Sequence, residues 1–343
     1  MMQKNGSISI DAQNIMPVIK RWLYSDKDIF IREMVSNGCD AITKYKLAQG
    51  GAEGEDLRVT VTVDAEAGEL RFTDNGIGMT GEEVEKYINQ VAFSGAEEFL
   101  KNYQGGEKDG IIGHFGLGFY SAFMVSDKVT IDTLSFQEGA APVIWESEDG
   151  MSFTMREGGR TERGTTITLH IMEEEKEFLD GVRVREVLDR YCGYMSVPIY
   201  VEDLAVIRRH EAEKAEKAKE QKPEDAAAPE AEKQEEEKPE EEKPINDTHP
   251  LWLKAPRDCT EEEYKETYRR LFHTYEDPLF WVHLNVDYPF NLKGILYFPR
   301  IRRDFGVNDG EIKLFNRQVF VADNIKEVIP EFLMLLKGVI DCP

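Results

Sequence analysis

The sequence predicts a two-layer α/β sandwich in which helices cover a mixed, mostly antiparallel sheet. A long helix is expected over 28–46, where apolar residues recur at helical spacing. Two strands are expected over 57–63 and 69–73, because polar and apolar residues alternate there. The connection between them, 64–68, is short enough to predict a hairpin, so an all-parallel sheet is excluded.

The helix over 28–46 carries a polar stripe. Glu33, Asn37 and Asp40 follow one another at i, i+4 and i+7, so they share one face. Ala41 lies close to that face. Residues that can cap or end a helix flank it: Ser25, Asp26, Gly50 and Gly51. Taken alone, such a stripe is more often a solvated face than a site, and its meaning depends on the motifs further along the chain.

A candidate ligand-binding turn comes after the second strand. Asp74 ends the strand, and Gly76 and Gly78 come directly after it. A carboxylate in this position can accept a hydrogen bond from an amine, and the glycines would let a flat ring approach the backbone. The signal is weak by itself, because tight turns use the same residues for conformational reasons.

A second glycine-rich stretch precedes an apolar helix expected over 119–125. Gly113, Gly116 and Gly118 would leave backbone N–H groups free to bind an anion where that helix begins. No Gly-Lys-Ser/Thr comes after it, so this is not a P-loop, and no strand leads into it, so it is not a dinucleotide fingerprint. The glycine-containing stretch 90–118 is expected to form a mobile lid.

The remaining elements of the first domain alternate along the chain. Thr165 opens one of the strands. The expected strands cover 7–10, 129–136, 143–146, 152–156, 165–171 and 199–201, and the expected helices cover 12–24, 82–90 and 176–191.

A charged stretch separates two globular parts. Between Ile207 and Ile245 the sequence contains no Leu, Ile, Val, Phe, Tyr or Trp, so 209–245 is expected to be a flexible linker between a domain over 1–208 and a partial domain over 246–343. A partner-binding tail is the less favoured alternative. The second part is expected to hold strands over 280–286, 294–298 and 312–321, with a helix over 328–340. Because the sequence stops at Pro343 without a clear domain end, a truncated chain is expected.

Composition narrows the functional class. The net charge of −24 over 343 residues argues against a nucleic-acid-binding surface as the main function. None of the four cysteines forms a C-x-x-C pair, so neither a zinc site nor a disulfide framework is indicated, and a reducing cytoplasm is expected. No signal peptide and no membrane-spanning run is found.

In this order, the three motifs resemble the ATPase superfamily of gyrase, heat-shock chaperones, histidine kinases and mismatch-repair proteins (GHKL, or Bergerat fold). The wider match resembles the ninety-kilodalton heat-shock chaperone family in its bacterial form. The segments that carry the resemblance are 24–33, Asn37, Asp40-Ala41, 74–80, 113–121, 246–252 and 276–279. Together they cover nearly the whole chain apart from the linker.

The resemblance implies a role for each motif residue. Glu33 would be the general base that activates water, and Asn37 would bind Mg²⁺. Asp74 would bind the adenine amine of ATP or ADP. The residues expected to support the base, ribose and phosphates are Asp40, Ala41, Lys44, Gly78, Met79, Gly113, Gly116, Gly118, Phe119 and Thr165.

Three positions depart from the family pattern. Tyr87 and Phe93 stand where the family commonly has an Asn and a Lys on the lid side, and Asn89 or Ser94 are the candidate substitutes. His114 stands where Gln is usual, and a packing or capping histidine is as plausible as a catalytic one.

By resemblance, the protein is expected to be an ATP-dependent chaperone whose clamp cycle assists the folding of client proteins, without nucleic-acid or membrane partners. The full-length protein would be a homodimer. The present chain would be mostly monomeric with weak turnover, because a middle-domain arginine and the dimerisation domain would lie beyond it. A DNA-handling ATPase is the alternative from another class, although the acidic composition opposes it. A sensor kinase is a third, although no phosphoacceptor helix pair precedes the site.

Overall fold

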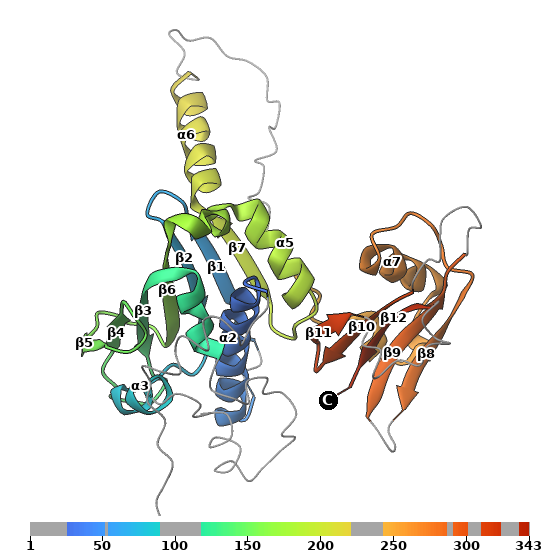
Figure 1. The fold of residues 1–343 in the computed structure, drawn as a ribbon, viewed down its shortest axis with the longest axis horizontal. Coiled ribbons are helices and arrows are strands. Elements are labelled where there is room, and N and C mark those ends of the chain that lie inside the picture. Colours follow the sequence, from blue (N-terminus) through green and yellow to red (C-terminus); the bar gives the residue numbers. More distant parts are fainter. Residues whose placement is uncertain are drawn as a thin grey trace, which may run out of the picture.

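A computed structural model describes residues 26–51, 54–89, 118–220, 243–286, 291–300, 310–323 and 336–342 (Figure 1). Several expected features lie outside these residues. They are the strand 7–10, the helix 12–24, nearly all of the expected lid, and with it Gly113, His114, Gly116, Phe93 and Ser94.

The first sheet has seven strands in the order β5-β4-β3-β6-β2-β1-β7. Every neighbouring pair is antiparallel except β1 and β7, which are parallel. The fold class predicted from the sequence, a mixed and mostly antiparallel sheet, is therefore confirmed. The strands are β1 (Val59–Asp64), β2 (Glu69–Asp74), β3 (Ser126–Leu134), β4 (Val143–Ser147), β5 (Thr154–Glu157), β6 (Gly164–Ile171) and β7 (Ile199–Asp203).

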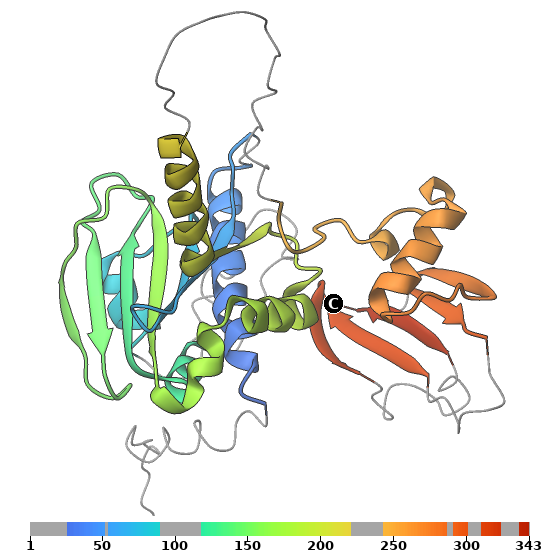
Figure 2. The same cartoon turned by 90° about the horizontal axis from the view of Figure 1, so that it is seen from above.

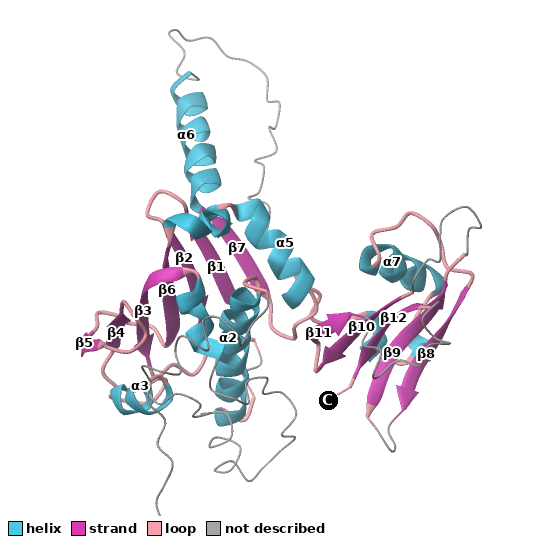
Figure 3. Cartoon of the chain, viewed as in Figure 1, coloured by secondary structure: helices cyan, strands magenta, loops and turns pink. Residues whose placement is uncertain are grey.

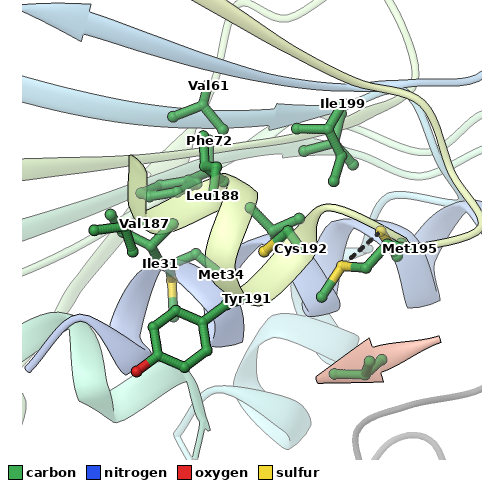
Figure 4. Packing of buried hydrophobic residues seen from close by; sticks show 14 of the residues in the cluster. Ile31, Met34, Val61, Phe72, Val187, Leu188, Tyr191, Cys192, Met195 and Ile199 are labelled. Atoms are coloured by element: carbon green, nitrogen blue, oxygen red, sulfur yellow. Dashed lines mark hydrogen bonds between the residues drawn. The ribbon is translucent and has the colours of Figure 1, made fainter. Parts of the chain in front are cut away.

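Helices cover one face of this sheet. The helices α2 (Ile29–Ala48) and α5 (Gly181–Cys192) lie on the same side of it, as the view from above shows (Figure 2). Buried apolar residues from these helices and from the strands meet between the two layers, and Figure 4 shows Met34, Val61, Phe72, Leu188 and Ile199 among them. Alternation along β2, where Leu70, Phe72 and Asp74 are buried, directs every second side chain toward the helices.

The ends of α2 agree with the expected signals. The carboxylate of Asp26 accepts a hydrogen bond of 3.1 Å from the backbone N–H of Asp28 at the helix start. At the other end, Gly50 and Gly51 adopt φ of 71° and 114°, which residues other than glycine rarely adopt. The helix therefore stops where the glycine pair predicts.

Two helices differ from the expectation. The single helix expected over 176–191 is broken into the 3₁₀ helix η3 (Glu173–Leu179) and α5, because Asp180 leaves the helical conformation and its side chain caps α5 by accepting from Val182 N–H at 2.9 Å. The apolar helix expected over 119–125 is the 3₁₀ helix η2 (Gly118–Met124). The short helix α3 (Gly81–Tyr87) begins with a capping box formed by Thr80 and Glu83.

The first part of the expected linker is helical. The helix α6 spans Leu204–Glu220, where Ala, Glu, Lys and Arg predominate. These residues have high helix propensity, so a helix can form there without a buried apolar face. The residues 221–242 lie outside the described part of the chain, and the proposed domain boundaries remain a prediction.

A second sheet comes next, separate from the first (Figure 3). Its order is β11-β10-β12-β9-β8, with β10 and β12 parallel and the other pairs antiparallel. The helix α7 (Glu261–Leu271) packs on it through Tyr264 and Tyr268. The other elements are η4 (Leu251–Leu253), η5 (Pro256–Asp258), β8 (Phe280–Val286), β9 (Leu292–Phe298), β10 (Glu311–Asn316), β11 (Val319–Asp323) and β12 (Lys337–Asp341).

Two expectations for this part were wrong. The strand expected over 312–321 is a hairpin, because Arg317 and Gln318 adopt φ of 50° and 66° and reverse the chain between β10 and β11. The helix expected over 328–340 cannot be correct at its end, where Lys337–Asp341 forms the strand β12 between β9 and β10. A buried apolar run does not distinguish a central strand from a helix by periodicity alone.

Candidate functional site

Asp74 is the last residue of β2 and lies at the centre of the candidate site. Its side chain is buried, and one carboxylate oxygen accepts the backbone N–H of Gly76 at 2.9 Å. Burial raises the pKa of Asp74 to about 7, although the backbone N–H groups of Gly76 and Thr165 and the charge of Arg160 act in the opposite direction. A buried carboxylate with spare acceptor capacity is suited to bind a polar donor from a ligand.

The two glycines after Asp74 are required by close packing within the protein. A Cβ atom on Gly76 would lie 2.5 Å from the carbonyl carbon of Ala41 in α2, and one on Gly78, where φ is 64°, would overlap the carbonyl oxygen of Leu134 in β3. Between them, Ile77 donates its N–H to the Ala41 carbonyl at 3.0 Å. The turn is thus clamped between α2 and β3, which gives both glycines a conformational reason.

Two buried threonines lie beside this turn. The hydroxyls of Thr133 in β3 and Thr165 in β6 are 3.0 Å apart, and the backbone N–H of Met79 donates to the Thr133 hydroxyl at 3.0 Å. The structure therefore places Asp74, Met79 and Thr165 close to one another, and their role in binding a base stays a prediction. Thr133 was missed, and its only signal is a hydroxyl at a buried position of an alternating strand.

The polar stripe of α2 faces the same region. Asp40 is buried, and Lys44, one turn further, is half-buried. Burial lowers the pKa of Lys44 below its ordinary value, and the negative charges of Asp40 and Glu83 offset only part of this shift, so these three groups are neighbours. Ala41 lies between Asp40 and Lys44 on the helix, and the turn after Asp74 packs against its backbone.

Glu33 lies at the other end of the stripe. Its carboxylate forms an ion pair of 2.6 Å with Arg32, and both side chains are about one-fifth exposed. A Cβ atom on Gly118, the first residue of η2, would overlap the other carboxylate oxygen of Glu33. The start of η2 therefore lies directly against the predicted general base. Arg32 was missed by the sequence reasoning because the pattern of the helix does not reveal which neighbour an arginine will choose.

Asn37 lies one turn beyond Glu33 and is half-buried. Among the described residues its side-chain amide has no hydrogen-bond partner. An amide oxygen is a ligand that Mg²⁺ accepts when phosphates and water complete its coordination, so the residue present fits a Mg²⁺ site of this kind. No group of three or more His, Cys, Asp or Glu residues within the described ranges could hold a metal by itself.

Gly118 and Phe119 are the described part of the predicted phosphate cradle. The Phe119 side chain is buried, and its ring packs edge-on to that of Trp145 at 5.7 Å. Only the backbone of Phe119 can therefore serve a ligand. The Trp145 indole donates to the side-chain oxygen of Asn89 at 2.9 Å, so Asn89, a candidate substitute for the family's lid-side residues, braces a core tryptophan with that atom.

The class of the protein is indicated by comparisons with known families. Residues 26–144 match the family model of the histidine kinase-, DNA gyrase B- and HSP90-like ATPases, and residues 177–343 match that of the Hsp90 protein. The first part of the chain is thus a GHKL-type ATPase domain, which agrees with its mixed sheet and helical layer.

Curated relatives identify the family more closely. The chain is 47% identical over 346 residues to the chaperone protein HtpG of Porphyromonas gingivalis W83, and 44% identical over 344 residues to that of Bacteroides fragilis YCH46. Both alignments cover 100% of this chain and 47% of the relative, and that of Geobacter metallireducens, at 36% identity, covers 99% and 52%. The chain belongs to the Hsp90 family and spans about half the length of these relatives. No helix within the described residues is long and apolar enough to cross a membrane.

Proposed function

We propose that this chain binds ATP and ADP with Mg²⁺, hydrolyses ATP, and is the nucleotide-driven part of a molecular chaperone. Its membership in the Hsp90 family and its ATPase-like domain support the proposal. The relatives that it matches over its whole length are named chaperone proteins. The role proposed for each residue comes from the family resemblance, and the geometry of the described part of the site supports it for the residues found there.

The adenine ring would bind at the Asp74 end of the site. Asp74 would accept the exocyclic amine, with Asp40 and Thr165 holding ordered water around the base. Met79 and Ala41 would pack against the ring, and Gly78 would keep the turn in place. Because Asp74 is buried and held by Gly76, the acceptor is oriented before a ligand arrives.

The phosphates would lie toward the other end of α2. Glu33 and Asp40 are seven residues apart, which is about 10 Å along a helix axis. Asn37 would bind Mg²⁺, and the backbone N–H groups of Gly118 and Phe119 would contact phosphate oxygens. Lys44 lies on the Asp40 side of the helix, and its long side chain would extend from there toward the ribose and phosphates. Gly113 and Gly116 would extend this cradle. When bound, Mg²⁺ would neutralise charge that develops on the phosphates during transfer.

Glu33 would act as the general base. A carboxylate can accept a proton from an attacking water molecule only if an oxygen is free to face that water. In this structure one oxygen of Glu33 is engaged by Arg32, while the other lies against Gly118. Hydrolysis would therefore require Arg32 or the start of η2 to shift so that Glu33 can reach the water.

The observation that carries the proposal is that two carboxylates, the buried Asp74 and the half-buried Glu33, stand beside the two ends of one polar helix face. The test is a calorimetric titration of ADP and of ATP, with and without Mg²⁺, followed by steady-state ATPase measurement. Binding that needs Asp74 and turnover that needs Glu33 would support the proposal. Wild-type binding by Asp74→Asn would overturn it.

We also propose unfolded or partly folded proteins as partners, a cytoplasmic location, and a homodimer for a protein of the relatives' length. The expected domain limits, 1–208, 209–245 and 246–343, belong to the same proposal. Nucleotide-dependent suppression of the aggregation of a model unfolded protein would test the chaperone part. Equal suppression with and without nucleotide would show that the ATPase site does not drive it.

A further inference from the structure

Asn246 is a buried polar residue to which the proposed ATPase mechanism gives no role. Its side chain is only 7% exposed. The amide nitrogen donates to the backbone carbonyls of Met195 at 2.7 Å and Val197 at 2.8 Å, and the amide oxygen accepts the backbone N–H of Ile199 at 2.8 Å. One side chain thus satisfies three backbone groups of the segment that joins α5 to β7.

The backbone on both sides of Asn246 runs beside the same segment. Ile245 donates its N–H to the carbonyl of Ile199 at 2.8 Å, and Asp247 donates to that of Gly193 at 2.9 Å. Residues 245–247 therefore run along residues 193–199. Asn is well suited to the central position, because its short planar amide offers two donors and an acceptor, whereas Asp offers no donor when ionised.

The second sheet is attached a few residues beyond this point. The ring of Tyr194 packs against Trp252 at 4.7 Å and against Phe315 at 5.6 Å, and the indole of Trp252 donates to Asp341 at 3.3 Å. The guanidinium of Arg270 lies over the Tyr194 ring and also pairs with Asp247. The position of the second sheet is thus set next to Asn246.

The second sheet contacts the candidate catalytic site through its strand β11. Arg32, which pairs with Glu33, also approaches the backbone carbonyl of Phe320 with its Nη1 at 3.5 Å. The ring of Phe320 packs against Tyr191 of α5 at 5.7 Å. A shift of the second sheet relative to α5 would change what Arg32 can bind, and so would change the surroundings of Glu33.

We propose that Asn246 is a positioning residue whose amide fastens the second sheet to the turn after α5. It thereby fixes how β11 stands beside Arg32 and Glu33. The structural role of Asn246 does not depend on the function proposed above. Only its expected effect on turnover rests on the proposed ATPase function. Loss of the side chain leaves three buried backbone groups to find new partners, which is unfavourable enough to release the segment.

The experiment measures the distance between the two sheets directly. Spin labels are placed at the exposed positions Asp127 in β3 and Tyr275 before β8, in a chain whose half-exposed Cys259 and Cys342 are replaced by serine. Without nucleotide, the unmodified Asn246 should give one narrow distance distribution by pulsed electron resonance. Asn246→Ala should lose it and give a broad distribution.

A matched control lies two residues away. Thr248→Ala removes a methyl group and a hydroxyl whose hydrogen bond is to its neighbour His249, so the narrow distribution should remain. Asn246→Asp keeps the size of the side chain and its acceptor but loses the donors, so it should broaden the distribution as well. This variant provides the test if Asn246→Ala does not fold. A narrow distribution in Asn246→Asp, or equal broadening in Thr248→Ala, would overturn the proposal.

Measurements of ADP affinity and of ATP turnover distinguish a positioning role of Asn246 from general damage to the ATPase domain. The affinity of Asn246→Asp for ADP should stay within about twofold of the parent, because the Asp74 end is untouched, while turnover should change by about fivefold or more. Equal loss of affinity and turnover would show damage to the whole ATPase domain and would contradict positioning. A chain without ATPase activity would disprove the proposed function, yet the distance measurement would still decide the fastening.

Discussion

The two ends of the candidate site are built differently. At the Asp74 end, the carboxylate, the two glycines and the threonine pair are held by backbone hydrogen bonds and close packing within one domain. At the Glu33 end, the carboxylate is half-buried and its partner Arg32 also touches β11 of the second sheet. The proposed base-binding end is therefore held together within the first sheet and its helices, whereas the proposed catalytic carboxylate has a partner that also contacts the second sheet.

The largest expected effect separates these ends by function. In a protein of the relatives' length, Glu33→Ala should lower ATP hydrolysis by about 10²–10⁴-fold, because a general base acts mainly in the transition state. ADP affinity, measured by calorimetry, should hardly change. The exposed Glu85→Ala on α3 is the control and should leave both quantities as they are. Loss of ADP binding together with turnover would show that Glu33 supports the fold of the site and would remove the contrast.

The buried state of Asp74 predicts an unusual pH dependence of stability. Its pKa is about 7 in the folded chain against an ordinary value of 3.8, so the native state holds an extra proton between about pH 4 and pH 7. The stabilisation is present below pH 4 and is lost as the pH rises through 7. Asp74→Asn should therefore gain stability over the parent with rising pH, by on the order of 4 kcal/mol over the whole range.

This prediction is checked by urea unfolding of both chains without nucleotide at pH 5 and pH 8. The difference in the free energy of unfolding between Asp74→Asn and the parent should be larger at pH 8. A difference that is the same at both pH values would mean that Asp74 is ionised throughout and is less buried than the structure shows.

The same substitution should act oppositely on binding. Asp74→Asn would remove the proposed charge-assisted hydrogen bond to the adenine amine, and a bond of that kind contributes roughly 1.5–3 kcal/mol. ADP affinity should fall about 10- to 150-fold at pH 8, as calorimetry would show. A variant that is more stable and binds nucleotide less well would mark Asp74 as a functional group kept at the expense of stability. An undiminished affinity for ADP would show that adenine binds at another part of the chain.

The smallest expected effect compares two glycines with similar backbone conformation. Gly50 and Gly78 have φ of 71° and 64°, but only at Gly78 would a Cβ atom meet another backbone. Gly50→Ala should cost about 1 kcal/mol for the left-handed conformation alone. Gly78→Ala should cost at least about 1–2 kcal/mol more and weaken ADP binding. An equal loss in the free energy of unfolding for the two variants, measured with urea, would show that the turn after Asp74 can shift to accommodate a Cβ atom.

The spacing of apolar residues and glycines made the local elements around the Asp74 end of the site predictable. The helix over 28–46, the hairpin before Asp74 and the end of the helix at Gly50 are dictated by local patterns of apolar residues and glycine. The contacts of Arg32 and Thr133 could not be predicted, because their partners come from elements distant in the sequence. Arg317 and Gln318 carry no turn signal, so the hairpin after β10 was read as one strand.

The charged stretch shows a different limit. Lack of apolar residues predicted a flexible linker from 209, yet α6 continues to Glu220 because Ala, Glu and Lys favour the helix by themselves. Composition says that a segment cannot bury a core, and it does not say that the segment lacks secondary structure. The fastening of Asn246 beyond this stretch was likewise invisible, since only the fold brings it beside Ile199.

The most direct test of the central claim is a crystal structure of the chain with ADP and Mg²⁺. We expect a carboxylate oxygen of Asp74 about 2.9 Å from the exocyclic amine of adenine, and the amide oxygen of Asn37 about 2.1 Å from the metal. The β2 turn, with Gly76 and Gly78, should be in the conformation described without nucleotide. Adenine bound away from Asp74, or a turn rebuilt to admit it, would contradict the claim that the base end of the site is formed in advance.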